Sequence, residues 1–161
     1  MSMTADSLIA EFRSMSEAEL ERRFCGPAAA PALAPGDYTG TWLARIENAG
    51  KYKPFNFISQ YLMFELTPFG ISFRGDGSGI WYFFDPRFAA GEFVTSNTRS
   101  RWRNTDCLAM DYGQANLPGC VRDLLYDEIK VLSPQHAIGI GGFNQPTGEG
   151  DNFYFLLTRK A

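Results

Sequence analysis

Two neighbouring carboxylates in the second half of this 161-residue chain are the residues best placed for acid–base chemistry. Asp127 and Glu128 lie in a stretch whose apolar side chains recur at every second position, as in a β-strand. Because neighbouring side chains of a strand point to opposite faces, we expect Asp127 to share the inner face with Ile129. An inward carboxylate is costly unless it is paired, and Tyr112 or Arg101 could pair it. Asp127 with Tyr112 is therefore a candidate acid–base pair.

A second candidate for proton transfer is His136, the single histidine of the chain. It follows Ser133-Pro134-Gln135, so we expect it in a turn. An imidazole has an ordinary pKa near neutrality, and this one could serve as a general base or as a lone axial haem ligand. The alternative is a surface residue without a chemical role.

Three arginines alternate with other residues in a further polar stretch. Arg99, Arg101 and Arg103 would share one face of a strand, with Ser100 and Trp102 on the other. Guanidinium groups on an inner face could grip a carboxylate or phosphate of a ligand. The alternative places the arginines in solvent and Trp102 in the core, because an indole is more easily buried than three charges.

The cysteine, histidine and charge content argues against several classes of protein. The three cysteines are widely spaced, so we expect neither a disulfide framework nor a zinc site, and we expect a cytoplasmic location. A net charge of -3 and a pI near 5.2 argue against a dedicated nucleic-acid binder. No apolar run is long enough to span a bilayer, no signal peptide is apparent, and no cofactor is identified by the sequence.

The elements that would position these residues are predicted to be short strands. Aromatic residues make up 15% of the chain, which also holds 16 glycines and 9 prolines, and this composition is typical of many strands and turns. The predicted strands cover residues 38–47, 57–67, 70–74, 80–84, 92–97, 98–103, 107–112, 124–132, 137–143 and 152–159. Their short spacing predicts a β-sandwich or β-barrel rather than βαβ units.

The N-terminal part of the chain is predicted to be helical. Apolar residues recur at helical spacing within residues 4–24, and Ser16 with Glu19 forms a capping box that would start a second helix. A Pro- and Ala-rich linker follows. We therefore expect a helical arm and linker over residues 1–36 and a β-barrel domain over residues 37–161.

Two of the predicted strands, within residues 80–84 and 153–157, are apolar on both faces. A barrel strand normally alternates, so we expect both faces of these strands to be covered. The N-terminal helices, a partner subunit or a ligand inside the barrel could provide the cover.

The opening of the first predicted strand and the end of the last one carry a family likeness. Gly40-Thr41-Trp42 opens the strand after the helical lead-in, and Arg159 ends the final strand. This arrangement resembles the lipocalin or calycin superfamily, in which a Gly-x-Trp opens strand one and an arginine near the chain end packs over the indole. The resemblance implies an antiparallel β-barrel in which Trp42 and Arg159 plug one end through a cation–π contact.

The function expected from these observations is the binding of a small apolar or amphipathic molecule inside the barrel. The expected ligand-binding residues are Arg101, Tyr112, Phe64, Phe73, Trp81, Phe83 and Tyr154. One alternative is a metal-independent isomerase or lyase on the same barrel, with Asp127 and Tyr112, Tyr126 or His136 as its acid and base. Another is a structural or interaction protein that forms a homodimer.

Overall fold

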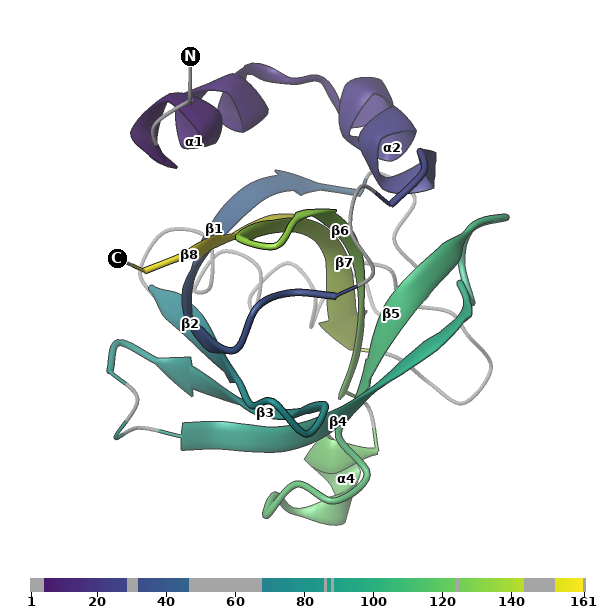
Figure 1. Ribbon diagram of the computed structural model, residues 1–161. Coiled ribbons are helices and arrows are strands. Elements are labelled where there is room, and N and C mark those ends of the chain that lie inside the picture. The colour runs from purple at the N-terminus through teal and green to yellow at the C-terminus, as the bar shows by residue number, and fades with distance from the viewer. Residues whose placement is uncertain are drawn as a thin grey trace.

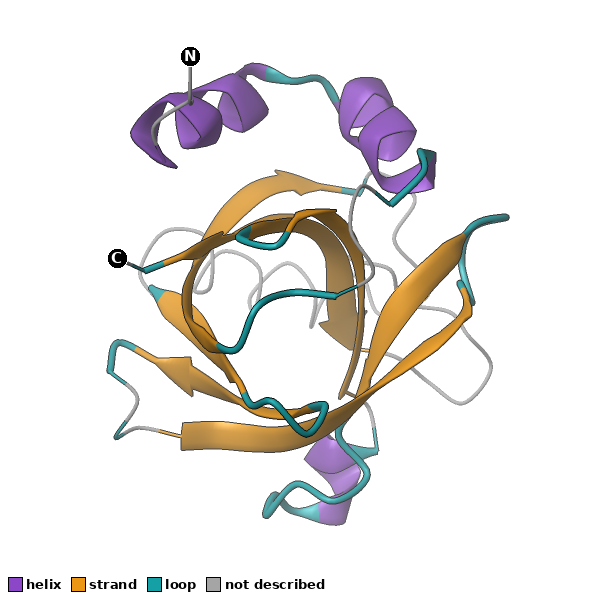
Figure 2. Cartoon of the chain, viewed as in Figure 1, coloured by secondary structure: helices purple, strands orange, loops and turns teal. Residues whose placement is uncertain are grey.

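The computed structural model describes residues 5–28, 32–46, 68–85, 87, 89–123, 125–143 and 153–160. Two N-terminal helices, α1 (Ala5–Ser14) and α2 (Glu17–Cys25), precede the strands (Figures 1 and 2). The remaining elements are β1 (Gly36–Arg45), β2 (Phe69–Phe73), β3 (Ser78–Phe83), β4 (Ala89–Arg99), β5 (Asp106–Asp111), the short helix α4 (Gly119–Arg122), β6 (Leu125–Ser133), β7 (His136–Phe143) and β8 (Phe153–Arg159).

The described strands form a closed barrel in which each strand pairs with the next along the chain. All pairings are antiparallel, and β8 returns to pair with β1. The predicted mainly-β fold, an antiparallel barrel after a short helical segment, is confirmed. The predicted strand over residues 57–67 lies outside the described residues. No helix in the described part of the chain has the length and apolar character needed to cross a membrane.

The prediction of two strands over residues 92–97 and 98–103 was wrong, because a single strand, β4, ends at Arg99 and a bend follows. Ser100 makes the bend. Its side-chain oxygen accepts hydrogen bonds from the backbone N–H groups of Trp102, at 3.1 Å, and Arg103, at 2.9 Å. Serine side chains compete in this way with the hydrogen bonds of a strand. Arg101 and Arg103 therefore lie outside any strand, and the three arginines do not share one strand face as expected.

Helices α1 and α2 cover the outer face of the barrel next to β1, β7 and β8 (Figure 1). The capping box at the start of α2 is present, and the Ser16 backbone N–H donates to the Glu19 carboxylate at 2.8 Å. Phe12, Leu20 and Phe24 are buried against the outward side chains of β7 and β8. The N-terminal helices thus cover the second apolar face of β8.

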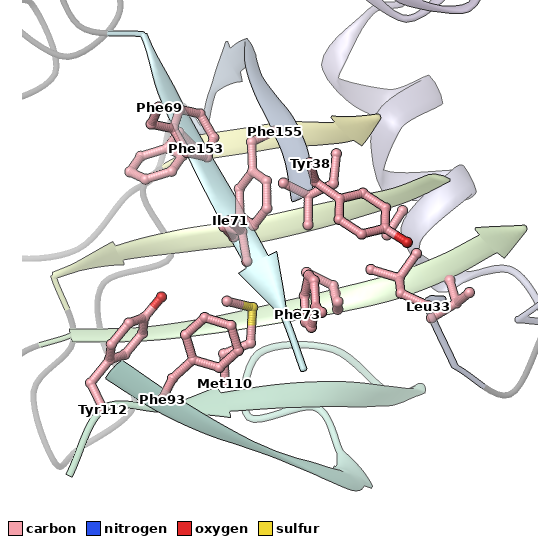
Figure 3. Close-up of a cluster of buried hydrophobic side chains, with 14 of the residues drawn as sticks. Leu33, Tyr38, Phe69, Ile71, Phe73, Phe93, Met110, Tyr112, Phe153 and Phe155 are labelled. Carbon is pink, nitrogen blue, oxygen red and sulfur yellow. The ribbon is translucent and has the colours of Figure 1, made fainter. Parts of the chain in front are cut away.

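The barrel interior is filled by aromatic rings that lie over glycines of the neighbouring strand. Gly139 of β7 pairs with Phe155 of β8, and Gly40 of β1 pairs with Phe69 of β2. A Cβ atom added to Gly139 would lie 2.2 Å from the Phe155 ring. Only a residue without a side chain leaves room for these rings, which Figure 3 shows gathered from several strands.

We predict that Gly139→Ala lowers the free energy of unfolding by about 1–3 kcal/mol, because the added methyl group overpacks the space that the Phe155 ring fills. Chemical denaturation would measure the change. Gly75→Ala is the control, since a Cβ at this turn position would meet only Pro35, at 3.8 Å. Equal stability of the two variants would contradict the packing argument.

Candidate functional site

The candidate site is a cavity at the end of the barrel where β1, β3, β5 and β7 finish and the other strands begin. Its volume is about 40 Å³. Its lining is mostly aromatic and comprises Trp42, Phe69, Ile71, Trp81, Tyr112, Leu125, Asp127, Gly142, Phe153 and Phe155. Phe69, Phe153 and Tyr112 stand at this end of the core in Figure 3, and Tyr38 with Leu33 stands at the other.

Asp127 is the one carboxyl group among the described residues that line the cavity. Strand β6 places it on the inner face because the strand alternates, and Glu128 points to the outer face. The Tyr112 hydroxyl donates a hydrogen bond to Asp127 Oδ2 at 2.5 Å. The structure therefore brings Asp127 together with Tyr112, one of the two partners that the sequence offered for it.

The protonation of Asp127 is set by opposing effects. Burial raises the pKa of the carboxyl to about 7, although hydrogen bonds from Tyr112 and from the Gly142 backbone lower it in part. Burial and the neighbouring Asp127 charge raise the pKa of Tyr112 well above its usual range, so the phenol remains a hydrogen-bond donor. Asp127 can therefore exchange a proton near neutral pH, whereas Tyr112 keeps its own.

Aromatic rings form the wall around this pair. The Trp42 ring lies 4.2 Å from the ring of Phe69 and 4.7 Å from that of Phe153 between centroids, the latter in an edge-to-face contact. Trp81 of β3 stands on another part of the wall and contacts Phe83 edge-on, with the centroids 4.3 Å apart. Both indoles are only partly buried, so the rim of the cavity is formed by apolar surface that a ligand can cover.

The structure places Arg101 outside the barrel, which corrects its expected role inside. Its guanidinium lies over the Tyr126 ring, 3.7 Å from the centroid, and its backbone N–H donates to Glu128 at 2.7 Å. The side chain is exposed in the bend that follows β4. It therefore cannot contact a ligand in the cavity, and Tyr112 alone of the two expected partners pairs with Asp127.

Tyr154 also points outward, which corrects its expected place in the ligand-binding wall. Its hydroxyl donates to Glu21 of α2, and Arg103 forms an ion pair with the same carboxylate at 2.6 Å. Tyr154 therefore holds the helical arm on the barrel. Its neighbours Phe153 and Phe155, which the sequence patterns did not single out, line the cavity instead.

His136 lies at the far end of the barrel from Asp127. It begins β7 and pairs with Ser133, whereas Asp127 pairs with Gly141 near the other end of the same two strands. Burial lowers the pKa of His136, and its buried Nδ1 has no hydrogen-bond partner in the described part of the chain. The two residues cannot form an acid–base pair. Tyr126 points outward from β6 and is excluded as a partner as well.

Trp42 and Arg159 lie at opposite ends of the barrel and do not form the expected plug. Arg159 pairs with Tyr38 and donates to the Pro35 carbonyl at 2.9 Å, four residues along β1 from Trp42. Tyr38 closes that end instead, donating to the Ala34 carbonyl at 2.7 Å beneath the linker that crosses the opening (Figure 1).

The other residues expected in the ligand-binding wall lie in different parts of the barrel. Trp81 lines the cavity and Phe83 packs beside it. Phe73 is in the inner core but lies near Tyr38, 5.4 Å away between ring centroids, at the covered end. Phe64 lies outside the described residues. No group of ligands suited to a metal ion occurs within the described ranges.

The fold is similar to that of a solved protein from Thermomonospora curvata, with a TM-score of 0.56 and 16% sequence identity. The match covers 97% of this chain and 95% of that one. No protein-family model matches the chain, and no curated protein matches it. At this identity the likeness concerns the fold alone, so function has to be argued from the site.

We predict that Asp127→Asn stabilises the protein at pH 8 but not at pH 4. The pKa of Asp127 is about 7 in the folded protein and about 3.9 in an unfolded chain. Folding therefore takes up a proton between these values, and the free energy of unfolding falls as pH rises through that window. Asparagine never ionises and still accepts from Tyr112, so the variant should gain about 2–4 kcal/mol at pH 8.

Denaturant unfolding of both proteins from pH 4 to pH 8 would test this prediction. Asp37→Asn is the matched control, because it removes the same charge from an exposed position at the other end of the barrel. Parallel stability curves for wild type and Asp127→Asn would show that Asp127 has an ordinary pKa.

Proposed function

We propose that this protein is a calycin-like barrel that binds a small amphipathic molecule in the cavity around Asp127 and Tyr112. The observation that carries the proposal is a hydrogen-bonded carboxyl–phenol pair in an otherwise apolar, mostly aromatic cavity. Ligand sites combine apolar walls with a few placed polar groups, and groups with a perturbed pKa gather in them. Trp42, Phe69, Trp81, Phe153 and Phe155 would supply the wall.

The energetic cost of Asp127 supports this proposal. A carboxyl group whose pKa is raised by burial destabilises the folded state at neutral pH, and an apolar residue on the same face would not. Real proteins break local rules of this kind mainly at functional sites. A ligand with a polar end would use the carboxyl group that the fold alone does not need.

The size of the cavity limits how the ligand fits. Its volume of about 40 Å³ exceeds the ~10–15 Å³ that a cavity needs to hold one water. It is far below the ~300–1,000 Å³ of a whole drug-sized site. We therefore place the polar end of the ligand inside, against Asp127, and its apolar body between the partly exposed indoles of Trp42 and Trp81.

The three tryptophans allow a direct test, because Trp42 and Trp81 line the cavity and Trp102 lies on the outer face. We predict that p-cresol, benzyl alcohol or benzylamine shifts the indole N–H signals of Trp42 and Trp81 in ¹⁵N-correlated NMR spectra and leaves that of Trp102 in place. Trp→Phe substitutions would assign the signals. The proposal is wrong if all three compounds leave every indole signal unchanged.

A pair of variants would locate the binding. Leu125→Phe fills the cavity and should weaken binding by about tenfold or more, since the phenyl group takes the space of the ligand. Leu132→Phe adds the same volume in the outer cluster and should leave binding unchanged. Equal effects of the two variants would place the binding elsewhere.

A second function is favoured by the pKa of Asp127 near 7, which suits a general acid or base at neutral pH. On this alternative the barrel is a metal-independent isomerase or lyase, in which Asp127 moves the proton and Tyr112 orients it by hydrogen bonding. For any substrate that the protein turns over, kcat/KM should rise with pH through about 7 if Asp127 is the base. Asp127→Asn should then lower kcat by about 10²–10⁴-fold, and retained turnover would exclude this function.

A further inference from the structure

The charges around the cavity bear on the chemical class of its ligand. We propose that the ligand is a small primary amine, bound as an ammonium ion with its charge against Asp127 and its carbon skeleton among the aromatic rings. This inference rests on the proposed binding function and goes beyond it, because it fixes the sign of the ligand's charge and the size of its polar group.

The first argument is electrostatic. Among the described residues that line the cavity, Asp127 is the only group that can carry a charge at neutral pH, and no lysine, arginine or histidine joins it. Arg101, the guanidinium expected there, lies on the outer face over Tyr126. An anionic ligand would meet a carboxylate with no compensating cation among these lining residues, and like charges placed together in a desolvated site are strongly disfavoured. A cation would neutralise Asp127.

The second argument is the chemistry of the wall. Rings of Trp42, Phe69 and Phe153 pack around one side of the cavity, and Trp81 stands on another. The faces of aromatic rings attract cations, most strongly at tryptophan and most of all where water is excluded. A carboxylate inside a set of aromatic rings therefore offers an ammonium ion two kinds of attraction, whereas a neutral polar group gains only hydrogen bonds.

The third argument is size. A volume of about 40 Å³ exceeds the ~10–15 Å³ that a cavity needs to hold one water. It therefore admits a –NH₃⁺ group, which is about as large as a water molecule. The ammonium group also has three donors. The Asp127 carboxylate and the Tyr112 hydroxyl, whose proton already points to Asp127, offer acceptor positions for them.

Binding of a cation should be coupled to the ionisation of Asp127. Among the described residues, the titratable groups near this carboxyl are Tyr112, which directly follows β5 and stays protonated, and Glu128 on the outer face of β6. Strand β7 contributes the Gly142 backbone N–H. The amine binds the ionised form. With a pKa near 7, the ionised fraction falls roughly 30-fold between pH 8 and pH 5.5, and amine affinity should fall by about that factor.

Three ligands of nearly equal shape test the inference: 2-phenylethylamine, 2-phenylethanol and phenylacetate. Each would be titrated into the protein at pH 8 and pH 5.5, with the Trp42 and Trp81 indole signals as the readout. We expect the amine to bind at least about tenfold more tightly than the alcohol at pH 8, as one neutralised charge would give. This advantage should be lost at pH 5.5, and phenylacetate should bind most weakly.

Asp127→Asn should abolish the preference for the amine and keep the binding of the alcohol, whereas Asp37→Asn should behave as wild type. If the alcohol or phenylacetate binds wild type as tightly as the amine at pH 8, the inference is overturned and the binding function stands. If none of the three moves the indole signals, the binding function fails, and the inference fails with it.

Discussion

The packing of aromatic rings over glycines of the neighbouring strand is the constraint on which the rest of the barrel depends. An eight-stranded barrel is just wide enough for side chains to fill it, and here Phe69 and Phe155 do so by lying over Gly40 and Gly139. The linker and Tyr38 close one end. Among the described residues a small space remains at the other end, and the character of the site follows from the few side chains that reach it.

Strand β6 carries two carboxyl groups on consecutive residues, Asp127 and Glu128, and their environments are different. Glu128 is fully buried on the outer face, where the Ser100 hydroxyl and the Arg101 backbone N–H donate to it. This carboxylate serves the architecture, because it holds the bend after β4 against the barrel. Asp127 on the inner face has the phenol of Tyr112 and one backbone N–H. Alternation thus separates a structural carboxylate from one that is available to a ligand.

The sequence predicts the local elements well, because their signals are local. The bounds expected for β2, β5, β6, β7 and β8 lie within one residue of those observed at each end, and the inward orientation of Asp127 follows from period-two alternation alone. Arg101 was misplaced because Ser100 turns the backbone. Tyr154 was misplaced because a strand that is apolar on both faces does not reveal its inner side. The Gly-x-Trp pattern is too short to show how β1 is aligned with β8. That alignment places Trp42 and Arg159 at opposite ends of the barrel.

Closure of the barrel also limits how this protein can assemble. Every described strand has a partner on each side over part of its length, and the unpaired backbone groups that remain form short rows, such as residues 96–99 of β4. A second copy therefore finds little described strand edge on which to extend the sheet, which is a common route to association among open β-proteins. A homodimer would be built mainly from side chains of the helices, loops or outer strand faces. Few large apolar groups are available there, since Phe84 and Val94 are the exposed ones among the described residues.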